Sequence, residues 1–362
     1  MLLPFVPESK IWQERRRAGT LRRPSFGELF SPELRRTTLV TAALSACAYG
    51  VAFGALQLTP TRIVPGIADL AEQQKLLKPL QDEAAQFNRQ LDEVKPRFDQ
   101  GCKEVAGLRE LSGQRAKTRL ALRANAKALD APDSAEGKKV LLQSTLNDLT
   151  NRLAALDGEL SRLTGANVEA KKALLEREKI FGQLSANREK QSKPDTIVKT
   201  RGKDVQFWQE MGGLLGRISL AVLLAVAISK GTLLRLFQVP GLLVIPVTYI
   251  WLFRDQPALF QWGVAVAGFL TVAQFSYFGE YLPRVFPLHL RATGGSFATN
   301  VGGRMLGTSA AFVTTNFVAP LFGGSGPMQV ATAAAIVGTS MFALGLILSF
   351  LLPEPKQQTT SD

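Results

Sequence analysis

The sequence predicts an all-α membrane protein with six transmembrane helices and a long antiparallel coiled-coil hairpin inserted after the first of them. Apolar stretches long enough to cross a bilayer lie toward both ends of the chain, and a charged segment with leucine heptads lies between them. Short basic joints connect several of the apolar stretches. The 362 residues are 46% hydrophobic and 20% charged, and these two classes are segregated along the chain, unlike in an ordinary soluble protein.

The membrane spans are predicted from length, because about 20 consecutive apolar residues cross a bilayer. The second and third candidates lie close together, and Lys230, Arg235 and Pro240 interrupt them. In chain order the six candidates are Thr38–Leu58, Gly212–Ile228, Leu233–Phe253, Ala258–Phe278, Ala292–Val318 and Val330–Leu352.

The basic joints predict the orientation of these spans. They are the arginine-rich segment before the first span, the joint with Lys230 and Arg235, the joint with Arg284 and Arg291, and the tail with Lys356. All of them fall on one side of the membrane if each span crosses once. The positive-inside rule then predicts a protein of the cell (inner) membrane with both termini in the cytosol. The charged segment is then extracytoplasmic. The net charge is +13, but the basic residues do not form a patch interleaved with aromatic residues, which argues against a nucleic-acid partner.

Five regions follow from these assignments. They are a cytosolic segment 1–37, a first transmembrane helix 38–64, the extracytoplasmic hairpin 65–204, a five-helix transmembrane bundle 205–353 and a cytosolic tail 354–362.

The charged segment has heptad spacing, which predicts a coiled coil. One run is Leu142, Leu146, Leu149, Leu153, Leu156, Leu160 and Leu163, and an earlier run is Leu77, Leu80, Ala84, Phe87, Leu91, Val94 and Phe98. Between the runs, Asp130–Gly137 has turn chemistry, so a hairpin with its tip near Pro132 is expected. Gly101, Gly107 and Gly113 weaken the first arm. The hairpin is either a docking arm for an extracytoplasmic protein or for self-association, or a solvated spacer.

Four sequence landmarks resemble the major facilitator superfamily of transporters, in particular its sugar-porter-like and metabolite-symporter-like members. Val6–Trp12 (VPESKIW) is similar to the signature that follows the sixth helix of that family, and Phe26–Thr37 is similar to the end of its central cytosolic loop. Leu352–Lys356 (LPEPK) resembles the motif after the twelfth helix. The hinge and eleventh helix are matched by Tyr281, Leu282, Pro283, Phe286, Pro287, Arg291, Thr293, Gly294, Asn300, Gly303 and Arg304.

The resemblance covers 1–62 and 206–362 and implies the C-terminal six-helix half of a transporter whose N-terminal half is missing from this chain. It implies secondary transport of a small solute, a sugar or an organic anion, by alternating access between two halves. The chain departs from the family at Arg284, where a glutamate is usual, and in the coiled-coil insert. The alternatives are a membrane-anchored structural or interaction protein that presents a periplasmic coiled coil, or an inactive truncated product.

The candidate site residues are polar groups within or beside the spans. The solute-pathway candidates are Gln57, Gln274, Tyr277 and Asn316, although helix–helix hydrogen bonds would account for them equally well. The gating and hinge candidates are Glu280, Arg284, Arg291, Asn300, Arg304 and Arg217. Arg217 is alternatively explained by snorkelling to the interface or by pairing with Glu210. A loop-end ion pair with Arg284 or Arg291 is the expected role of Glu280.

Two stripes of small residues are expected to let helices approach closely. One is Gly294, Ala298 and Gly302, and the other is Gly303 and Gly307.

The sequence has no catalytic or metal-binding motif, so we expect no enzyme activity and no cofactor. His289 is the only histidine, and Cys47 and Cys102 are the only cysteines. The expected partners are the lipid bilayer, a small solute and the missing half.

Overall fold

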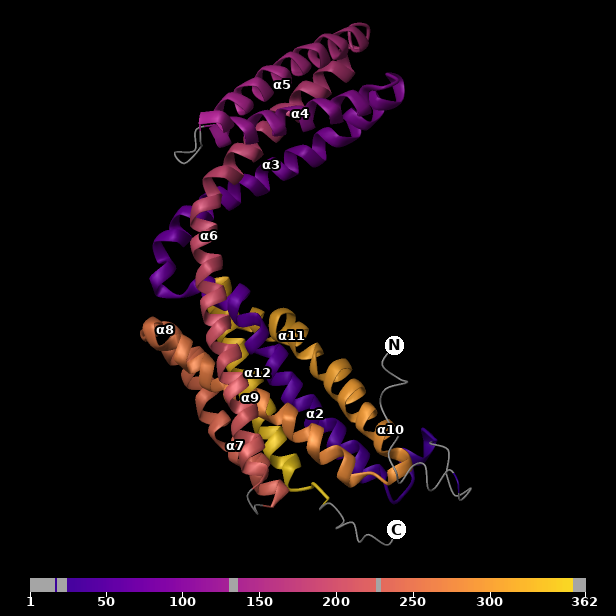
Figure 1. The fold of residues 1–362 in the computed structure, drawn as a ribbon, viewed down its shortest axis with the longest axis vertical. Coiled ribbons are helices and arrows are strands. Elements are labelled where there is room, and N and C mark those ends of the chain that lie inside the picture. The colour runs from indigo at the N-terminus through magenta and orange to yellow at the C-terminus, as the bar shows by residue number, and fades with distance from the viewer. Residues whose placement is uncertain (1–16, 18–24, 130–135, 226–228, 354–362) are drawn as a thin grey trace. The chain divides into compact units, whose positions relative to one another are not determined.

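The computed structural model describes residues 17, 25–129, 136–225 and 229–353. Within these residues all regular secondary structure is helical, which confirms the all-α prediction, and no strand is present. The chain forms two compact units (Figure 1): a membrane unit made of Met1–Gln74 and Asp195–Asp362, and an insert unit, Lys75–Pro194. Helix α6 (Val168–Leu224) contributes residues to both units.

Four helices of the membrane unit are long and apolar enough to cross a bilayer: Arg35–Gly66, Lys230–Asp255, Pro257–Val285 and Gly326–Ser349. They contain α2 (Arg35–Gly54), α7 (Lys230–Pro246) with η7 (Val247–Leu252) and α8 (Phe253–Asp255), α9 (Pro257–Val285), and α12 (Gly326–Ser349). They correspond to the first, third, fourth and sixth predicted spans. Many large apolar side chains on these helices are exposed, including Leu243, Ile347 and Trp251, as expected of a surface that contacts lipid.

The second and fifth predicted spans are not among these four helices. The second belongs to the last part of α6, and the predicted end of this span at Ile228 lies outside the described residues. The fifth is broken into α10 (Arg291–Ser296), η9 (Phe297–Gly307), α11 (Ser309–Val313) and η10 (Thr314–Val318), of which η9 and η10 are π-helical. Whether these two segments cross a membrane therefore stays a prediction.

Contacts between helices of the membrane unit establish the directions in which the helices run. Gly50 approaches Met341 and Gly54 approaches Val337, so α2 and α12 run antiparallel. In the same way, Lys230 lies beside Glu280 and Gln238 beside Gln274, so α7 and α9 run antiparallel. These contacts agree with a chain that reverses direction from one long helix to the next.

Glycines mark the closest helix contacts of this unit. A Cβ atom added at Gly302 would lie 2.2 Å from the carbonyl oxygen of Ala42 on α2, and one at Gly307 would lie 2.4 Å from the Cβ of Tyr49. A Cβ at Gly216 of α6 would lie 2.2 Å from the carbonyl oxygen of Phe269 on α9. Gly302 and Gly307 of the predicted stripes therefore lie where α2 comes closest, whereas added Cβ atoms at Gly294 and Gly303 would meet the rings of Phe286 and Tyr49.

The insert unit contains four helices rather than the two arms of a hairpin. They are α3 (Ala71–Glu104), α4 (Leu108–Leu129), α5 (Glu136–Leu163) and the first part of α6. The prediction that the insert consists of two long arms is therefore wrong for the described residues. The chain reverses after Glu104, between α4 and α5, and again after Leu163. Pro132 itself lies outside the described residues.

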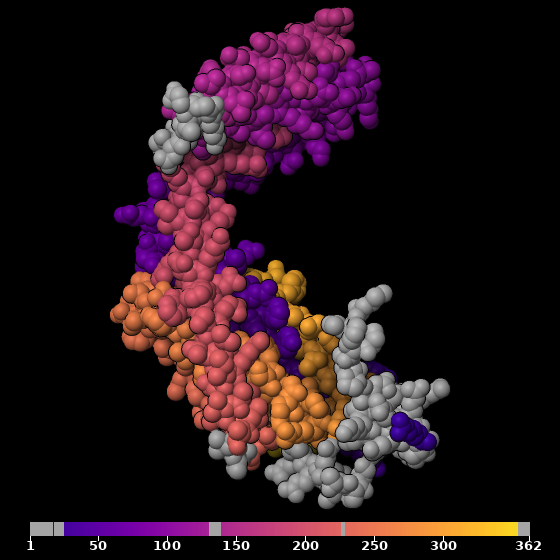
Figure 2. Space-filling view, viewed as in Figure 1, coloured from indigo at the N-terminus to yellow at the C-terminus, as the bar shows by residue number. Residues whose placement is uncertain are grey.

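Cross-helix contacts establish these directions. Glu104 bonds Asn167 at 2.7 Å, and Glu83 bonds Asn187 at 2.9 Å, so α3 and α6 run antiparallel. On α4, Arg115 bonds both Asp157 of α5 and Glu178 of α6. Further along α4, Lys127 pairs with Glu189 of α6 at 3.2 Å, so α4 and α6 run parallel. In Figure 2 the side chains of these helices form a continuous outer surface on the face that is shown.

Two local features explain the unexpected reversals. Gly107 has a φ of +83°, a left-handed conformation that glycine adopts without steric cost, and it lies directly before α4. Asn167 accepts a hydrogen bond from the backbone N–H of Ala170 at 2.9 Å, which caps the start of α6. Glycine and asparagine thus break the heptad pattern where the chain turns. The resulting core contains Phe98, Leu108, Leu160, Ala170, Ala173 and Leu174.

Candidate functional site

The candidate site lies on the helical segment formed by α10 and η9. Its buried side contains Gly294, Ala298 and Gly302. Ser296, Asn300 and Arg304 are exposed at four-residue intervals. We call these three residues the polar flank. Exposed apolar side chains follow on η9, on α11 (Ser309–Val313) and on η10 (Thr314–Val318), namely Met305, Leu306, Phe312 and Phe317, and the exposed polar residues Ser309 and Asn316 lie among them.

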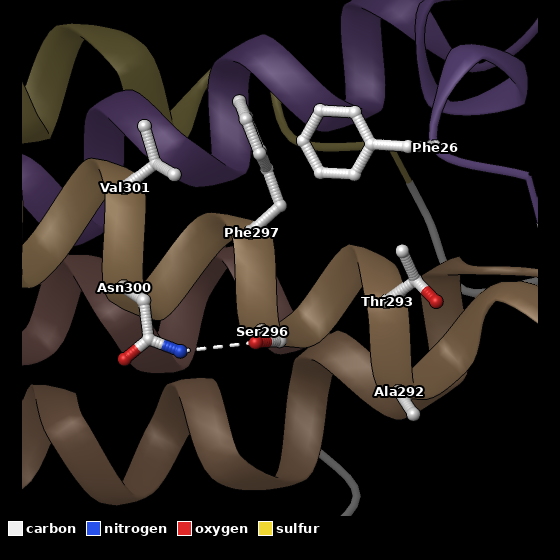
Figure 3. Close-up of a pocket in the computed structure, with 7 residues that line it drawn as sticks. All are labelled: Phe26, Ala292, Thr293, Ser296, Phe297, Asn300 and Val301. Atoms are coloured by element: carbon white, nitrogen blue, oxygen red, sulfur yellow. Dashed lines mark hydrogen bonds between the residues drawn. The ribbon is translucent and has the colours of Figure 1, made fainter.

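A pocket of about 540 Å³ opens on the polar flank, and Figure 3 shows the seven residues that line it. Asn300 donates a hydrogen bond from Nδ2 to Ser296 Oγ at 3.0 Å. Phe26 and Phe297 meet edge to face, with their ring centroids 5.6 Å apart. The remaining lining residues are Ala292, Thr293 and Val301. The pocket therefore combines hydroxyl and amide groups with aromatic surface, and none of its lining residues among the described ranges is charged.

The segment Gly27–Phe30 (η2) places Phe26 beside this pocket. The Thr38 hydroxyl donates to the carbonyl oxygen of Leu29 at 2.8 Å. His289 Nε2 lies 2.9 Å from Glu28 Oε1, which connects the segment to the turn before α10. Neither Phe26 nor the Glu28–His289 pair is predicted from the sequence to be part of a site. These residues are far apart in the sequence, and no residue pattern connects them.

The charged residues of the predicted hinge form a small ion-pair group. Glu280 pairs with Arg284 and lies 3.5 Å from Lys230, which joins the end of α9 to the start of α7. Arg291 does not join this group: within the described part of the chain its buried Nε has no hydrogen-bond partner. The four-residue spacing of Glu280 and Arg284 accounts for their pairing on one helix face.

The four predicted pathway residues do not form one cluster. Gln274 and Tyr277 are buried inside the membrane unit, and Gln274 accepts a hydrogen bond from Gln238 at 3.4 Å. Gln57 and Asn316 are exposed, and Asn316 donates to the carbonyl oxygen of Phe312 on its own helix. For Gln274, the structure therefore contains a hydrogen bond to a neighbouring helix, which is the alternative to a role in the solute pathway.

The two arginines predicted within spans are both exposed. The described residues give neither Arg217 nor Arg304 an ion pair, so the alternative pairing of Arg217 with Glu210 is not formed. Arg304 follows Asn300 by four residues on the polar flank. An unpaired guanidinium on this segment requires water, a lipid headgroup or a partner group.

The structure also contains a group of three aromatic residues that the sequence does not predict. Tyr49 packs against Phe53 and Phe275, with ring centroids 6.1 and 4.6 Å away, and also approaches Gly303 and Gly307. All three aromatic side chains are half-buried. Aromatic residues are so common in membrane helices that only the tertiary contacts distinguish these three.

The fold defines this chain as a helical protein with four helices long and apolar enough to cross a membrane. No cluster of histidine, cysteine, aspartate or glutamate suited to a metal ion occurs among the described residues. No protein-family model, curated protein sequence or solved structure matches the chain.

Proposed function

We propose that this chain is one six-helix half of a secondary transporter, and that its polar flank faces the solute pathway. The observation that carries the proposal is the division of the α10–η9 surface. Met305 and Leu306 are apolar and 64% and 55% exposed, whereas Ser296, Asn300 and Arg304 are exposed polar residues of the same segment. A helix surrounded by lipid alone would not present these three polar groups together.

The position of Arg304 strengthens this argument. Arg304 lies roughly 20 Å along the helix from Arg291, at 1.5 Å per residue. If Arg291 marks the cytosolic boundary, the Arg304 side chain lies well inside the hydrocarbon region. A charge there is stable only in a water-filled cavity or against another protein surface.

A second six-helix half would supply that surface, as in transporters that bind solute between two halves. The resemblance to major facilitator proteins favours a sugar or a small organic anion as solute. Hydroxyl and amide groups beside the aromatic edges of Phe26 and Phe297 suit a hydroxylated solute, and Arg304 suits a carboxylate. In this proposal both termini are cytosolic in an inner membrane, and the insert unit is extracytoplasmic.

Uptake measurements test the transport function. Uptake is compared across a panel of radiolabelled sugars and organic anions. Cells that express the protein should accumulate at least one of these solutes above the level in cells that lack it. Arg304→Ala should abolish that uptake without lowering the amount of protein in the membrane. Met305→Ala, a change at the neighbouring lipid-facing position, is the matched control and should leave uptake unchanged. No uptake of any solute, or equal uptake by Arg304→Ala, would contradict the proposal.

Cysteine accessibility tests the polar flank without knowledge of the solute. In a variant without Cys47 and Cys102, Asn300→Cys should react in intact membranes with a small hydrophilic thiol reagent. Phe312→Cys, at an exposed apolar position of α11, should react far less, because lipid surrounds it. Equal labelling of the two positions would show that the flank does not border an aqueous pathway.

The rival function is a membrane-anchored scaffold whose insert unit recruits an extracytoplasmic partner. The separate core of the insert unit, with Leu108 and Leu160 buried in it, supports this alternative. Deleting Lys75–Pro194 distinguishes the two functions once membrane insertion of the variant has been verified. If the deletion variant takes up solute as the wild type does, the insert is a spacer. If neither the wild type nor the deletion variant takes up solute, and the deletion abolishes binding of an extracytoplasmic partner, the scaffold function is favoured.

A further inference from the structure

The two ends of the α4–α5 pair are packed differently. Toward the turns at Gly107 and Thr164, the side chains of Leu108, Ser112, Arg115, Thr118, Leu156 and Leu160 are buried. Toward the connection between α4 and α5, no residue of 119–129 or of 139–155 is buried. We call the first part the core end and the second part, made of 119–129 and 139–155, the loop end.

The loop end is joined to α6 through polar contacts. Arg123 donates a hydrogen bond to Ser185 Oγ, and Lys127 pairs with Glu189 at 3.2 Å. The side chains of Lys127 and Glu189 are 75% and 67% exposed, so water and salt screen their attraction. Arg119, at the boundary, lies 3.4 Å from Glu178, whose carboxylate also binds Arg115.

The core end is held by a different kind of contact. The apolar cluster there combines side chains from all four helices, among them Phe98, Leu108, Leu160 and Leu174. Arg115, whose side chain is only 11% exposed, bonds Asp157 and Glu178 and so fastens α4 to both α5 and α6. Salt affects the contact between Arg115 and Glu178, whose side chains are 11% and 16% exposed, much less than it affects exposed ion pairs.

We propose that the loop end is a salt-sensitive strap that separates from α6 while the core end stays packed against it. The contacts of Arg115 with Asp157 and Glu178 are the pivot of this movement. Regions with few buried contacts and exposed polar bonds open with the lowest free energy in a folded protein. The strap is a property of the insert unit and does not depend on the proposed transport function.

Hydrogen exchange on the full chain in detergent micelles tests the strap. At about 0.05 M salt, amides of 119–129 and 139–155 should exchange at least about tenfold faster than amides of 108–118 and 156–163. Raising the salt to about 0.5 M should accelerate exchange at the loop end by roughly two- to fivefold and leave the core end unchanged. Equal protection of the two ends, or no effect of salt on the loop end, would overturn the proposal.

A charge exchange provides the matched control. Lys127→Glu places two carboxylates opposite each other and should accelerate exchange at the loop end alone. Adding Glu189→Lys restores opposite charges and should return exchange to the wild-type rate. The proposal fails if the single variant deprotects the core end as well, or if the double variant does not recover.

Discussion

The membrane unit and the insert unit are both all-helical, yet their helices associate by different means. In the membrane unit the closest contacts are backbone to backbone, as at Gly302 against Ala42 and Gly216 against Phe269. In the insert unit one close contact of this kind also occurs, at Gly101 against Ala170, but larger apolar side chains such as Leu108 and Leu160 fill most of the core. Ion pairs such as Arg97–Glu176 lie at its rim.

This difference reflects the solvent that each unit is expected to meet. Lipid tails are as apolar as leucine, so burying leucine between membrane helices gains little, and close backbone contact replaces it. In water, burial of leucine drives association and charged side chains keep the outside soluble. The comparison supports a membrane location for the first unit and an aqueous location for the second.

The largest expected effect comes from filling a backbone contact of the membrane unit. Gly302→Leu would force η9 away from the Ala42 carbonyl, and we expect a loss of about 3 kcal/mol or more in the free energy of unfolding. Thermal denaturation in detergent measures it. Gly279→Ala is the control, because an added Cβ at Gly279 meets no atom within 4 Å and should be neutral or slightly stabilising. Equal stability of the two variants would show that the backbone contact is unimportant.

A smaller effect is expected from the ion-pair layer of the insert unit. Arg115→Leu leaves the carboxylates of Glu178 and Asp157 without their shared partner, and Glu178 is only 16% exposed. We expect the insert unit to lose about 2–3 kcal/mol, measured by hydrogen exchange at the core end. Arg97→Ala removes the exposed pair with Glu176 in the same unit and should cost less than about 0.5 kcal/mol. If Arg115→Leu loses no measurable free energy of unfolding, the apolar core alone stabilises this unit.

The cap of α6 should contribute less again. Asn167→Ala removes the hydrogen bond to the Ala170 amide and should destabilise the insert unit by about 1 kcal/mol. Asn167→Asp keeps the capping oxygen but places a second carboxylate beside Glu104, so it should recover only part of that stability. Chemical denaturation followed by circular dichroism compares the two variants. If aspartate and alanine are equally destabilising, the side chain of Asn167 acts through Glu104 rather than as a cap.

The smallest effect is a dependence on pH. Hydrogen bonds from Asn167 and then from Gln100 lower the pKa of Glu104. A lowered pKa in the folded state means that this contribution is present above the ordinary glutamate pKa and is lost as the pH falls through the pKa of the folded state. The stability difference between wild type and Asn167→Asp, which keeps the cap but cannot donate to Glu104, should therefore narrow in acid. A difference that is independent of pH would exclude Glu104 as its source.

The candidate site could be predicted from the sequence only in part. The four-residue spacing of Asn300 and Arg304 placed them on one helix face, and the structure shows both exposed there. Gln274 and Tyr277 were candidates because they are polar residues within a span, but sequence position does not reveal which way a helix is rotated. Phe26 reaches the pocket through a contact between segments that are distant in the chain, which no local pattern encodes.

The sequence by itself determined the helical class, four of the long apolar helices and the heptad character of the insert, because these depend on length, composition and periodicity along the chain. The number of reversals in the insert was decided by tertiary structure, since the glycine at 107 and the asparagine at 167 become turn and cap only when the flanking helices pack together. The exposure of Arg304 and the burial of Tyr277 were decided in the same way. A periodic pattern specifies a helix face, but only packing selects the neighbour that the face meets.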